Sequence, residues 1–192
     1  MEGYSFFSLM SRMKNIDRWG LMRSSRRENL AEHCFETAAI AHALALIGNR
    51  YFGKSYDAEH IMCLAMYHDI CEVYTGDLPT PVKYFNEEMR ESYRRIESAS
   101  AEKLLSKLPE ELKCDYRSII VPDADAESLA LIKAADKISA LIKCTEEMNC
   151  GNPEFRTAYE TTKAAVESIA LPEVRFFCDN FLSAYGRTLD EM

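Results

Sequence analysis

Apolar residues recur at three- and four-residue steps along most of the chain, which is the spacing of an amphipathic helix. Asn29 and Glu32 form a capping-box pattern, so we expect a helix to begin there and to run to Gly48. Asp57 is a suitable N-cap for a second helix that continues to about Tyr74. The pattern therefore predicts two helices before the chain's midpoint.

A third helix is predicted over Val82–Leu108, because one face of that segment would be apolar. The apolar residues of this face are Phe85, Met89, Tyr93, Ile96, Leu104 and Leu108. At a rise of about 1.5 Å per residue the helix would be about 40 Å long. That length is comparable with the diameter of a small domain.

Three later segments open with residues that favour helix starts. They are Pro109-Glu110-Glu111, Asn152-Pro153-Glu154 and Pro172-Glu173. Residues 127–149 also have a strongly helical pattern, with apolar residues on most sides. Residues 118–121 fit either a short strand or the end of a helix, and no long alternating strand pattern occurs. We therefore predict an all-α fold, a helical bundle that forms a single domain over residues 1–192.

The composition agrees with this class and excludes several others. Only 7 glycines and 6 prolines occur in 192 residues, fewer than the turns of a β-sandwich or barrel would need. A formal net charge of −8 argues against a broad nucleic-acid-binding surface. It does not exclude a small anionic substrate, because a metal ion or a local basic residue reverses the field inside one cleft.

No apolar run approaches the length of about 18 residues needed to cross a bilayer, and the N-terminal segment does not resemble a secretory signal. The seven cysteines include no C-x-x-C pair, and we expect them to be reduced and mostly buried. These observations predict a cytoplasmic protein without a membrane or nucleic-acid partner.

Two acidic positions in predicted helices are candidates for chemistry. Asp136 belongs to a helix that is apolar nearly all round, so it needs a cation, hydrogen bonds or a metal ion. His68 and Asp69 are adjacent in the second predicted helix, with Glu72 one turn beyond His68. Taken separately, Asp136 fits a buried ion pair, and His68-Asp69 fits a core histidine beside a solvated aspartate.

His33 adds a second imidazole near the start of the first predicted helix. Together with His68, Asp69 and Asp136 it provides two imidazoles and two carboxylates from three helices. Mixed nitrogen and oxygen ligands suit one divalent transition metal such as cobalt, manganese or zinc, and they leave positions for water and substrate. We assign structural roles to the other two histidines.

The order of these residues, H…HD…D on helices, is the signature of the HD superfamily of metal-dependent phosphohydrolases. Over about residues 4–160 the chain resembles one branch more closely, the bacterial YfbR-type 5′-deoxynucleotidases. The similar stretches are IDRWGLMR (16–23), ENLAEHCFETAAIAHALA (28–45), AMYHDICEVYTGDLPTPVKYFN (65–86) and KAADKISALIKC (133–144).

The resemblance implies a dimeric, all-helical enzyme that hydrolyses 2′-deoxyribonucleoside 5′-monophosphates to deoxynucleoside and phosphate. The implied metal ligands are His33, His68, Asp69 and Asp136. The implied substrate-binding residues are Arg18, Trp19, His33, Asp77, Thr80, Pro81, Val82, Lys83 and Asp136. Arg18 and Glu72 are implied as catalytic residues, Arg18 on the phosphate and Glu72 near a metal-activated water.

Elementary chemistry is compatible with these roles and leaves alternatives open. The planar guanidinium of Arg18 suits phosphate oxygens, and Lys83 near a predicted helix start fits an anion. Trp19 is a candidate wall that would crowd the 2′-hydroxyl of a ribonucleotide, although a lone tryptophan is also typical of a core or an interface. Glu72 also fits a surface carboxylate, and Gly76–Pro81 also fits a simple helix-stop loop.

The sequence does not exclude two other functions. An HD phosphohydrolase could act on another nucleotide, such as a triphosphate or a cyclic dinucleotide, although triphosphate chemistry calls for more basic residues than Arg18 and Lys83. A helical interaction module could instead hold a structural metal, whose coordination would be closed.

Overall fold

The computed structural model describes residues 3–83 and 85–192, which fold into two compact units. Unit 1 comprises the residues up to Leu21, Arg27–Cys34 and Met66–Asp123. Unit 2 comprises Met22–Arg26, Phe35–Ala65 and Ala124–Met192. Each unit is therefore built from three separate segments of the sequence.

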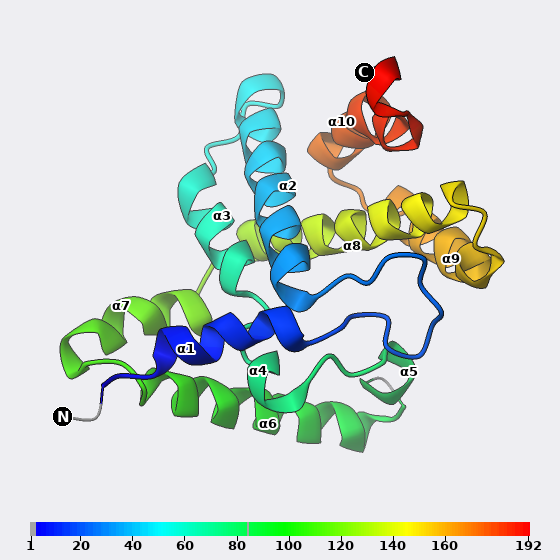
Figure 1. Cartoon of the computed structure of the whole chain (residues 1–192). Coiled ribbons are helices and arrows are strands. Elements are labelled where there is room, and N and C mark those ends of the chain that lie inside the picture. The colour runs from blue at the N-terminus through cyan, green and yellow to red at the C-terminus, as the bar shows by residue number, and fades with distance from the viewer. Residues whose placement is uncertain (1–2, 84) are drawn as a thin grey trace. The chain divides into compact units, whose positions relative to one another are not determined.

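The secondary structure of the described residues is helical, as predicted (Figure 1). No strand occurs among them, and their only extended pairing is an isolated antiparallel bridge between Asp17 and Asn29. The α-helices are α1 (Phe6–Met10), α2 (Leu30–Tyr51), α3 (Ala58–Tyr67), α4 (Glu72–Thr75), α5 (Thr80–Lys83), α6 (Glu87–Leu105), α7 (Glu110–Ile120), α8 (Ala126–Asn149), α9 (Arg156–Glu167) and α10 (Pro172–Phe181). The 3-10 turns are η1 (Ser11–Asn15), η2 (Pro153–Phe155), η3 (Leu182–Gly186) and η4 (Leu189–Glu191).

Side-chain caps open the first two long helices where the sequence predicts them. The Oδ1 atom of Asn29 accepts hydrogen bonds from the backbone N–H groups of Ala31 and Glu32, both at 3.1 Å. Asp57 Oδ1 accepts one from the backbone N–H of His60 at 2.9 Å. Such bonds satisfy donors that have no partner within the helix. Both predicted helix starts are confirmed.

The second predicted helix ends earlier than expected. α3 stops at Tyr67, and His68 and Asp69 lie in a turn before the short helix α4. Backbone bonds in this turn connect residues three apart, as from Ile70 N to Tyr67 O at 3.1 Å and from Glu72 N to Asp69 O at 3.0 Å. Three-residue winding aligns Asp69 with Glu72, so the expected alignment of Glu72 with His68 on one helix face is wrong.

The predicted 40 Å helix over Val82–Leu108 is also wrong, because α5 and α6 replace it. Asn86 has an extended backbone, and its side chain accepts a hydrogen bond from Met89 N at 2.7 Å, which starts α6 afresh. Tyr93 of the predicted apolar face is buried, as are both of its leucines. Phe85, Met89 and Ile96 are instead exposed.

The later helices agree with the sequence. α7 follows Pro109, α10 begins with Pro172, and the side chain of Asn152 caps the turn that leads into α9. α8 matches residues 127–149 within one residue at its start. The ambiguous segment 118–121 is the end of helix α7.

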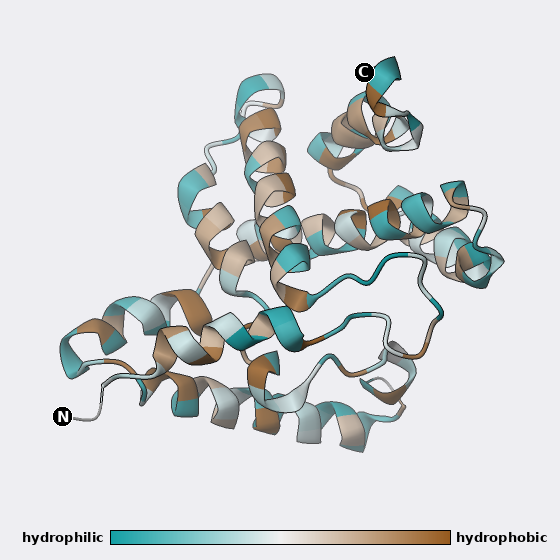
Figure 2. Cartoon of the chain, viewed as in Figure 1, coloured by the Kyte–Doolittle hydropathy of each residue, from teal (hydrophilic) through white to brown (hydrophobic). Residues whose placement is uncertain are grey.

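The core of unit 1 supports the turn that carries His68 and Asp69. In Figure 2, hydrophobic and hydrophilic residues alternate along α6, as expected of a helix with one apolar face. Ile70, which follows Asp69 directly, is 1% exposed and packs in this core. The buried members are Phe6, Met13, Leu30, Cys34, Ile70, Leu104, Leu105 and Leu108. The turn is therefore anchored by burial of its own apolar side chain.

In unit 2 the core follows helix α8, which packs along α9 (Figure 1). Most of its apolar side chains are buried, as its sequence predicts. They include Leu131, Ile132, Ile138, Leu141 and Ile142. The turn η3 contacts both α8 and α10.

The seven cysteines, all within the described residues, are free thiols. Only Cys34 and Cys144 are fully buried, and Cys114 and Cys150 are exposed. The expectation that most of them are buried is wrong.

Helix α2 is the one helix among the described residues that is long and apolar enough to cross a membrane. This differs from the expectation that no segment reaches that length. Inside the structure 56% of its apolar window is buried, as in the core helix of a globular protein. Length and composition alone are weak evidence for a membrane span.

Candidate functional site

A short backbone pairing in unit 1 positions Arg18 and Trp19. Arg18 N donates to Glu28 O at 2.9 Å, and Leu30 N donates to Ile16 O at 2.9 Å. These bonds flank the bridge between Asp17 and Asn29. Because residue 29 caps α2, the pairing ties the Arg18-Trp19 segment directly to the start of that helix.

The side chain of Glu28 joins the two neighbouring side chains. Its Oε2 atom accepts a hydrogen bond from Arg18 Nε at 3.2 Å and another from Trp19 Nε1 at 3.0 Å. Trp19 has a φ of +59°, the only positive φ of a non-glycine residue among those described. A bulky residue adopts this backbone only where its surroundings hold it.

His33, His68 and Asp69 lie close together within unit 1. His33 stands in the first turn of α2, and its side chain is completely buried. Asp69 Oδ2 is 3.1 Å from His68 Nε2 and 3.8 Å from His33 Nε2. The two imidazole rings are 5.3 Å apart between their centroids. One carboxylate oxygen is thus within reach of one nitrogen of each imidazole.

Charge around Asp69 keeps it ionised. Arg18 Nη1 lies 3.6 Å from Asp69 Oδ2. Burial alone would raise the pKa of Asp69, but His68, His33 and Arg18 together hold that pKa below its ordinary value. Burial lowers the pKa of His68, yet the adjacent Asp69 carboxylate raises it well above its usual value.

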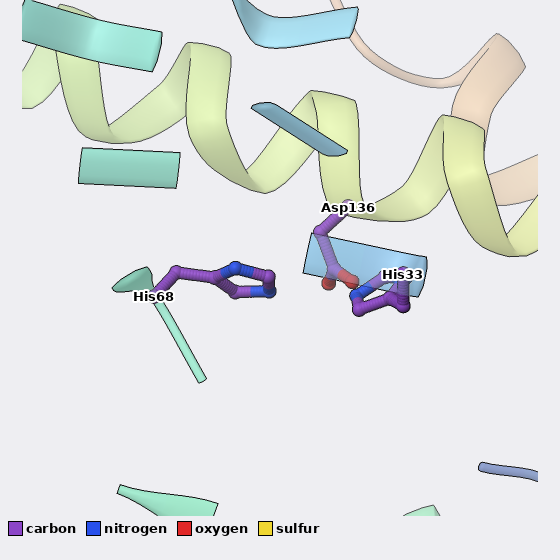
Figure 3. Close-up of side chains that lie close together, drawn as sticks. All are labelled: His33, His68 and Asp136. Atoms are coloured by element: carbon purple, nitrogen blue, oxygen red, sulfur yellow. The ribbon is translucent and has the colours of Figure 1, made fainter. Parts of the chain in front are cut away.

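Asp136 brings a further carboxylate to the two histidines. Figure 3 shows the side chains of His33, His68 and Asp136 pointing toward one another from α2, the turn after α3, and α8. One potential ligand atom from each lies within 4.8 Å of the other two. Asp136 is half-buried rather than fully buried, although its helix is largely apolar. Asp69 is outside this mutual group and approaches it through the two histidines.

Glu72 is buried, so the interpretation of Glu72 as a surface carboxylate is wrong. Its side chain is 6% exposed, and its Oε2 atom has no hydrogen-bond partner among the described residues. Burial, together with the charges of Asp69 and Asp77, raises the pKa of Glu72 to about 8. A carboxyl group with such a pKa exchanges a proton near neutral pH.

Lys83 ends helix α5 and does not lie at a helix start, so the expected help from helix N–H groups is wrong. Its Nζ atom is 3.8 Å from Glu72 Oε1 and 3.7 Å from Glu97 Oε1. It also lies 4.5 Å from the centroid of the Tyr93 ring. Burial lowers the pKa of Lys83, but the acidic groups around it raise that pKa above its ordinary value.

The loop between α4 and α5 leads from Glu72 to Lys83. Gly76 closes α4 with a φ of +70°, which favours glycine. Asp77 is half-buried, and burial raises its pKa, while Arg18 acts in the opposite direction. Pro81 and Val82 are exposed, and the side chain of Thr80 lies outside the described part of the structure. The loop thus exposes some of its residues and partly buries one acid.

The donor set fits a divalent transition metal. His33 and His68 supply imidazole nitrogens, and Asp136 and Asp69 supply carboxylate oxygens at the distances given above. Imidazole and carboxylate groups are common ligands of zinc, manganese and cobalt. A hydrogen-bond partner commonly orients a ligating imidazole, and Cys34 Sγ lies 3.9 Å from His68 Nδ1.

Residues near the site were missed by sequence reasoning. Glu28 lies in one of the stretches that resemble the family, residues 28–45, but nothing in the sequence pattern assigns it a role. Tyr93 and Glu97 surround Lys83 from α6. The one signal in the sequence was the position of Glu28, directly before the helix cap Asn29. The contacts around Lys83 join distant segments, and such contacts leave no local pattern.

A family model described as 5′-deoxynucleotidase YfbR-like matches residues 5–185 of this chain. The chain belongs to the YfbR-like 5′-deoxynucleotidase family. A relative from Shewanella oneidensis, named 5′-deoxynucleotidase, is 45% identical over 187 residues. That alignment covers 97% of this chain and 96% of the relative. The family resemblance inferred from the sequence is confirmed.

Two solved structures share the helical fold of the family. An HD-domain phosphohydrolase from Listeria innocua has a TM-score of 0.81 at 24% identity, covering 94% of this chain and 88% of that protein. A cyanophage S-2L HD phosphohydrolase, solved with dA and one catalytic Zn²⁺ ion, has a TM-score of 0.64 at 18% identity, covering 92% and 95%. At these identities the similarity establishes the fold alone.

Proposed function

We propose that the protein hydrolyses the phosphate ester of 2′-deoxyribonucleoside 5′-monophosphates and releases deoxynucleoside and inorganic phosphate. The observation that carries the proposal is the convergence of His33, His68 and Asp136 in a chain that aligns along its length with a 5′-deoxynucleotidase. Phosphate monoesters are dianionic near neutral pH. A protein of net charge −8 therefore needs local positive charge to bind one.

The proposed metal ligands are His33, His68, Asp69 and Asp136. When bound, a divalent metal ion supplies Lewis acidity that activates water and neutralises developing charge on phosphate oxygens. Zn²⁺, Mn²⁺ and Co²⁺ all accept such ligands. Asp69 is held ionised by its neighbours, which keeps it ready to bind a cation.

Arg18 and Glu72 are the proposed catalytic residues. The guanidinium of Arg18 is held next to Asp69, where it would donate to the oxygens of a phosphate bound at the metal site. Glu72 offers a buried carboxylate oxygen, Oε2, that would accept a proton from the attacking water. Both side chains belong to the same unit as the two histidines, so their positions follow from a single packed core.

The remaining proposed contacts surround the nucleoside. Trp19 would form a wall against the sugar, where the 2′-hydroxyl of a ribonucleotide would be crowded. The loop residues Asp77, Thr80, Pro81, Val82 and Lys83 would contact the substrate, as would His33 and Asp136 beside the metal. Lys83 would contribute positive charge, although acidic residues already surround it.

We also propose that residues 1–192 form one HD domain, because the family model spans residues 5–185 without interruption. We propose that the protein is a homodimer, that it is located in the cytoplasm, and that its small-molecule partner is a nucleotide. This assembly follows from family resemblance.

Phosphate release from pure substrates tests the reaction. Protein loaded with Mn²⁺ or Co²⁺ should release phosphate from deoxyadenosine monophosphate much faster than from adenosine monophosphate. Equal rates on the two would disprove the sugar selectivity. No release with any divalent ion would disprove the activity.

Substitution of a proposed ligand tests the metal site. Asp136→Asn should lower bound metal, measured by elemental analysis, and abolish phosphate release while the helical circular dichroism stays unchanged. Asp179→Asn is the matched control, because Asp179 is an exposed aspartate of the same unit. Unchanged metal content in Asp136→Asn would show that Asp136 is not a ligand.

A further inference from the structure

We propose that Glu28 is a positioning residue that holds Arg18 and Trp19 as one rigid pair, and so sets phosphate orientation and sugar selectivity together. This inference rests on the proposed function, which places Arg18 on the phosphate and Trp19 against the sugar. Glu28 itself lies behind the pair and acts only through it.

The contacts of Glu28 converge on those two residues. Its backbone carbonyl accepts from Arg18 N, and its Oε2 atom accepts from Arg18 Nε and Trp19 Nε1. The side chains of Glu28 and Arg18 are only 12% and 13% exposed. Little water therefore competes for these hydrogen bonds, and the two that reach the carboxylate are charge-assisted.

The backbone of Trp19 needs this support. Its φ of +59° lies in the left-handed region, which is unfavourable for a bulky side chain. The bridge between Asp17 and Asn29 holds the segment just before Trp19, and Glu28 fixes the indole N–H. The indole is thus oriented by one hydrogen bond at its polar edge, which leaves its apolar surface as the feature that meets a sugar.

Because of Glu28, the guanidinium of Arg18 faces two acids instead of one. Nε faces Glu28 at 3.2 Å, whereas Nη1 faces Asp69 Oδ2 at the longer distance of 3.6 Å. Without the Glu28 carboxylate, Asp69 would attract the whole guanidinium. Arg18 would then shift toward a proposed metal ligand and away from its position on the phosphate.

The chemistry explains why this position needs a glutamate. A single carboxylate oxygen accepts from both donors and carries the charge that pairs with Arg18. Glutamine keeps an acceptor oxygen but loses the charge. Aspartate is one methylene shorter and cannot reach both donors from the same backbone. Alanine removes both bonds.

Three variants test the proposal: Glu28→Gln, Glu28→Asp and Glu28→Ala. For Glu28→Ala, kcat/KM on deoxyadenosine monophosphate should fall about 100-fold, the cost of a displacement of about 1 Å. The ratio of kcat/KM on the deoxy substrate to kcat/KM on the ribo substrate should fall about tenfold, because the Trp19 indole against the sugar moves as well. Glu28→Gln should retain more of that ratio than Glu28→Ala, because its oxygen still accepts from the indole.

Trp19 is the only tryptophan, so its fluorescence reports the same contact without turnover. The emission of Glu28→Ala should shift and become more accessible to acrylamide, and that of Glu28→Gln should shift less. Glu102→Gln is the matched control, because Glu102 also holds an arginine, Arg117, through two hydrogen bonds, but both side chains are exposed. That control should leave emission, activity and substrate ratio unchanged.

Two results would overturn the proposal. The first is unchanged indole emission in Glu28→Ala with a normal helical spectrum. The second is equal loss on the deoxy and ribo substrates. If Glu28→Ala fails to fold, the same two measurements are made on Glu28→Gln and compared with wild type. Unchanged indole emission, or equal loss on the deoxy and ribo substrates, in Glu28→Gln would then overturn the proposal. Absence of activity in the wild-type protein would instead refute the proposed function, and the fluorescence comparison would still decide whether Glu28 holds the indole.

Discussion

Gly48 in unit 2 shows how one missing side chain permits a close packing contact. The sequence predicts a helix end at Gly48, but α2 continues to Tyr51. A Cβ atom at Gly48 would lie 2.6 Å from Tyr56 Cε2. The Asn49 side chain holds the Tyr56 backbone through two hydrogen bonds, and the Tyr56 hydroxyl donates to Glu173 Oε1 at 3.0 Å. The ring is therefore fixed against the helix.

We expect Gly48→Ala to lower the free energy of unfolding by about 1–2 kcal/mol, because overpacking outweighs the helix propensity gained from alanine. Urea denaturation followed by circular dichroism measures this change. Gly186→Ala is the control, since the nearest atom to its new Cβ is 3.6 Å away. A stabilised Gly48→Ala protein would show that the Tyr56 ring moves aside easily.

At the scale of elements, a buried ion pair on α8 holds the segment Met22–Arg26. Lys143 Nζ lies 2.5 Å from Glu147 Oε1 and donates to Arg26 O at 2.6 Å. Glu147 in turn accepts from Ser25 N at 2.8 Å and from the Asn152 side chain at 2.8 Å. Both charged side chains are at most 5% exposed. The helix thereby satisfies the polar groups of an irregular segment that packs on it.

This pair predicts a pH-dependent contribution to stability. Burial would raise the pKa of Glu147, but hydrogen bonds from Lys143, Asn152 and Ser25 lower it to about 2. Because the folded pKa is below the unfolded value of 4.5, the contribution is present above pH 4.5 and is lost as the pH falls toward 2. By linkage it amounts to about 3 kcal/mol near neutral pH.

Glu147→Gln should therefore be about 3 kcal/mol less stable than wild type at pH 7, and this difference should shrink steadily below pH 5. Urea unfolding over a series of pH values measures both effects. The control is Glu167→Gln, which breaks an exposed pair with Lys163 on α9 and should cost less than about 1 kcal/mol. A difference that stays constant with pH would contradict the assignment of the charge to Glu147.

At the scale of the whole molecule, the balance of charge limits which partners are favoured. The chain carries 31 acidic and 23 basic residues, so a polyanion meets repulsion over most of it. Arg18 and Lys83 place positive charge within unit 1, Arg18 next to Asp69 and Lys83 next to the buried Glu72. This arrangement favours one small phosphate compound over an extended nucleic acid.

The proposed homodimer gives a further prediction. Sedimentation equilibrium over a series of protein concentrations should give a mass twice that of the 22.0 kDa chain. A mass equal to one chain at every concentration would contradict the proposal. The measurement is independent of activity, so its result does not depend on the proposed reaction.

The helix starts could be predicted from the sequence because capping is local. Asn29, Asp57 and Asn152 each bond to a backbone N–H group two or three residues ahead, and those residues are visible in the sequence. The break before α6 was missed even though its cap, Asn86, is equally local. Apolar residues at helical spacing on both sides of Asn86 favoured one continuous helix. Several of these residues are exposed in the structure.

By itself the sequence determined that the protein is helical, where most helices begin, and which histidines and aspartates are candidates for a metal site. Those properties depend on spacing and residue type over a few positions. Only the tertiary structure decided that His68 and Asp69 lie in a tight turn, that Glu72 is buried, and that Lys83 faces acids. It also decided that Glu28 joins Arg18 to Trp19, since burial and pairing depend on segments that are far apart in the chain and meet only after folding.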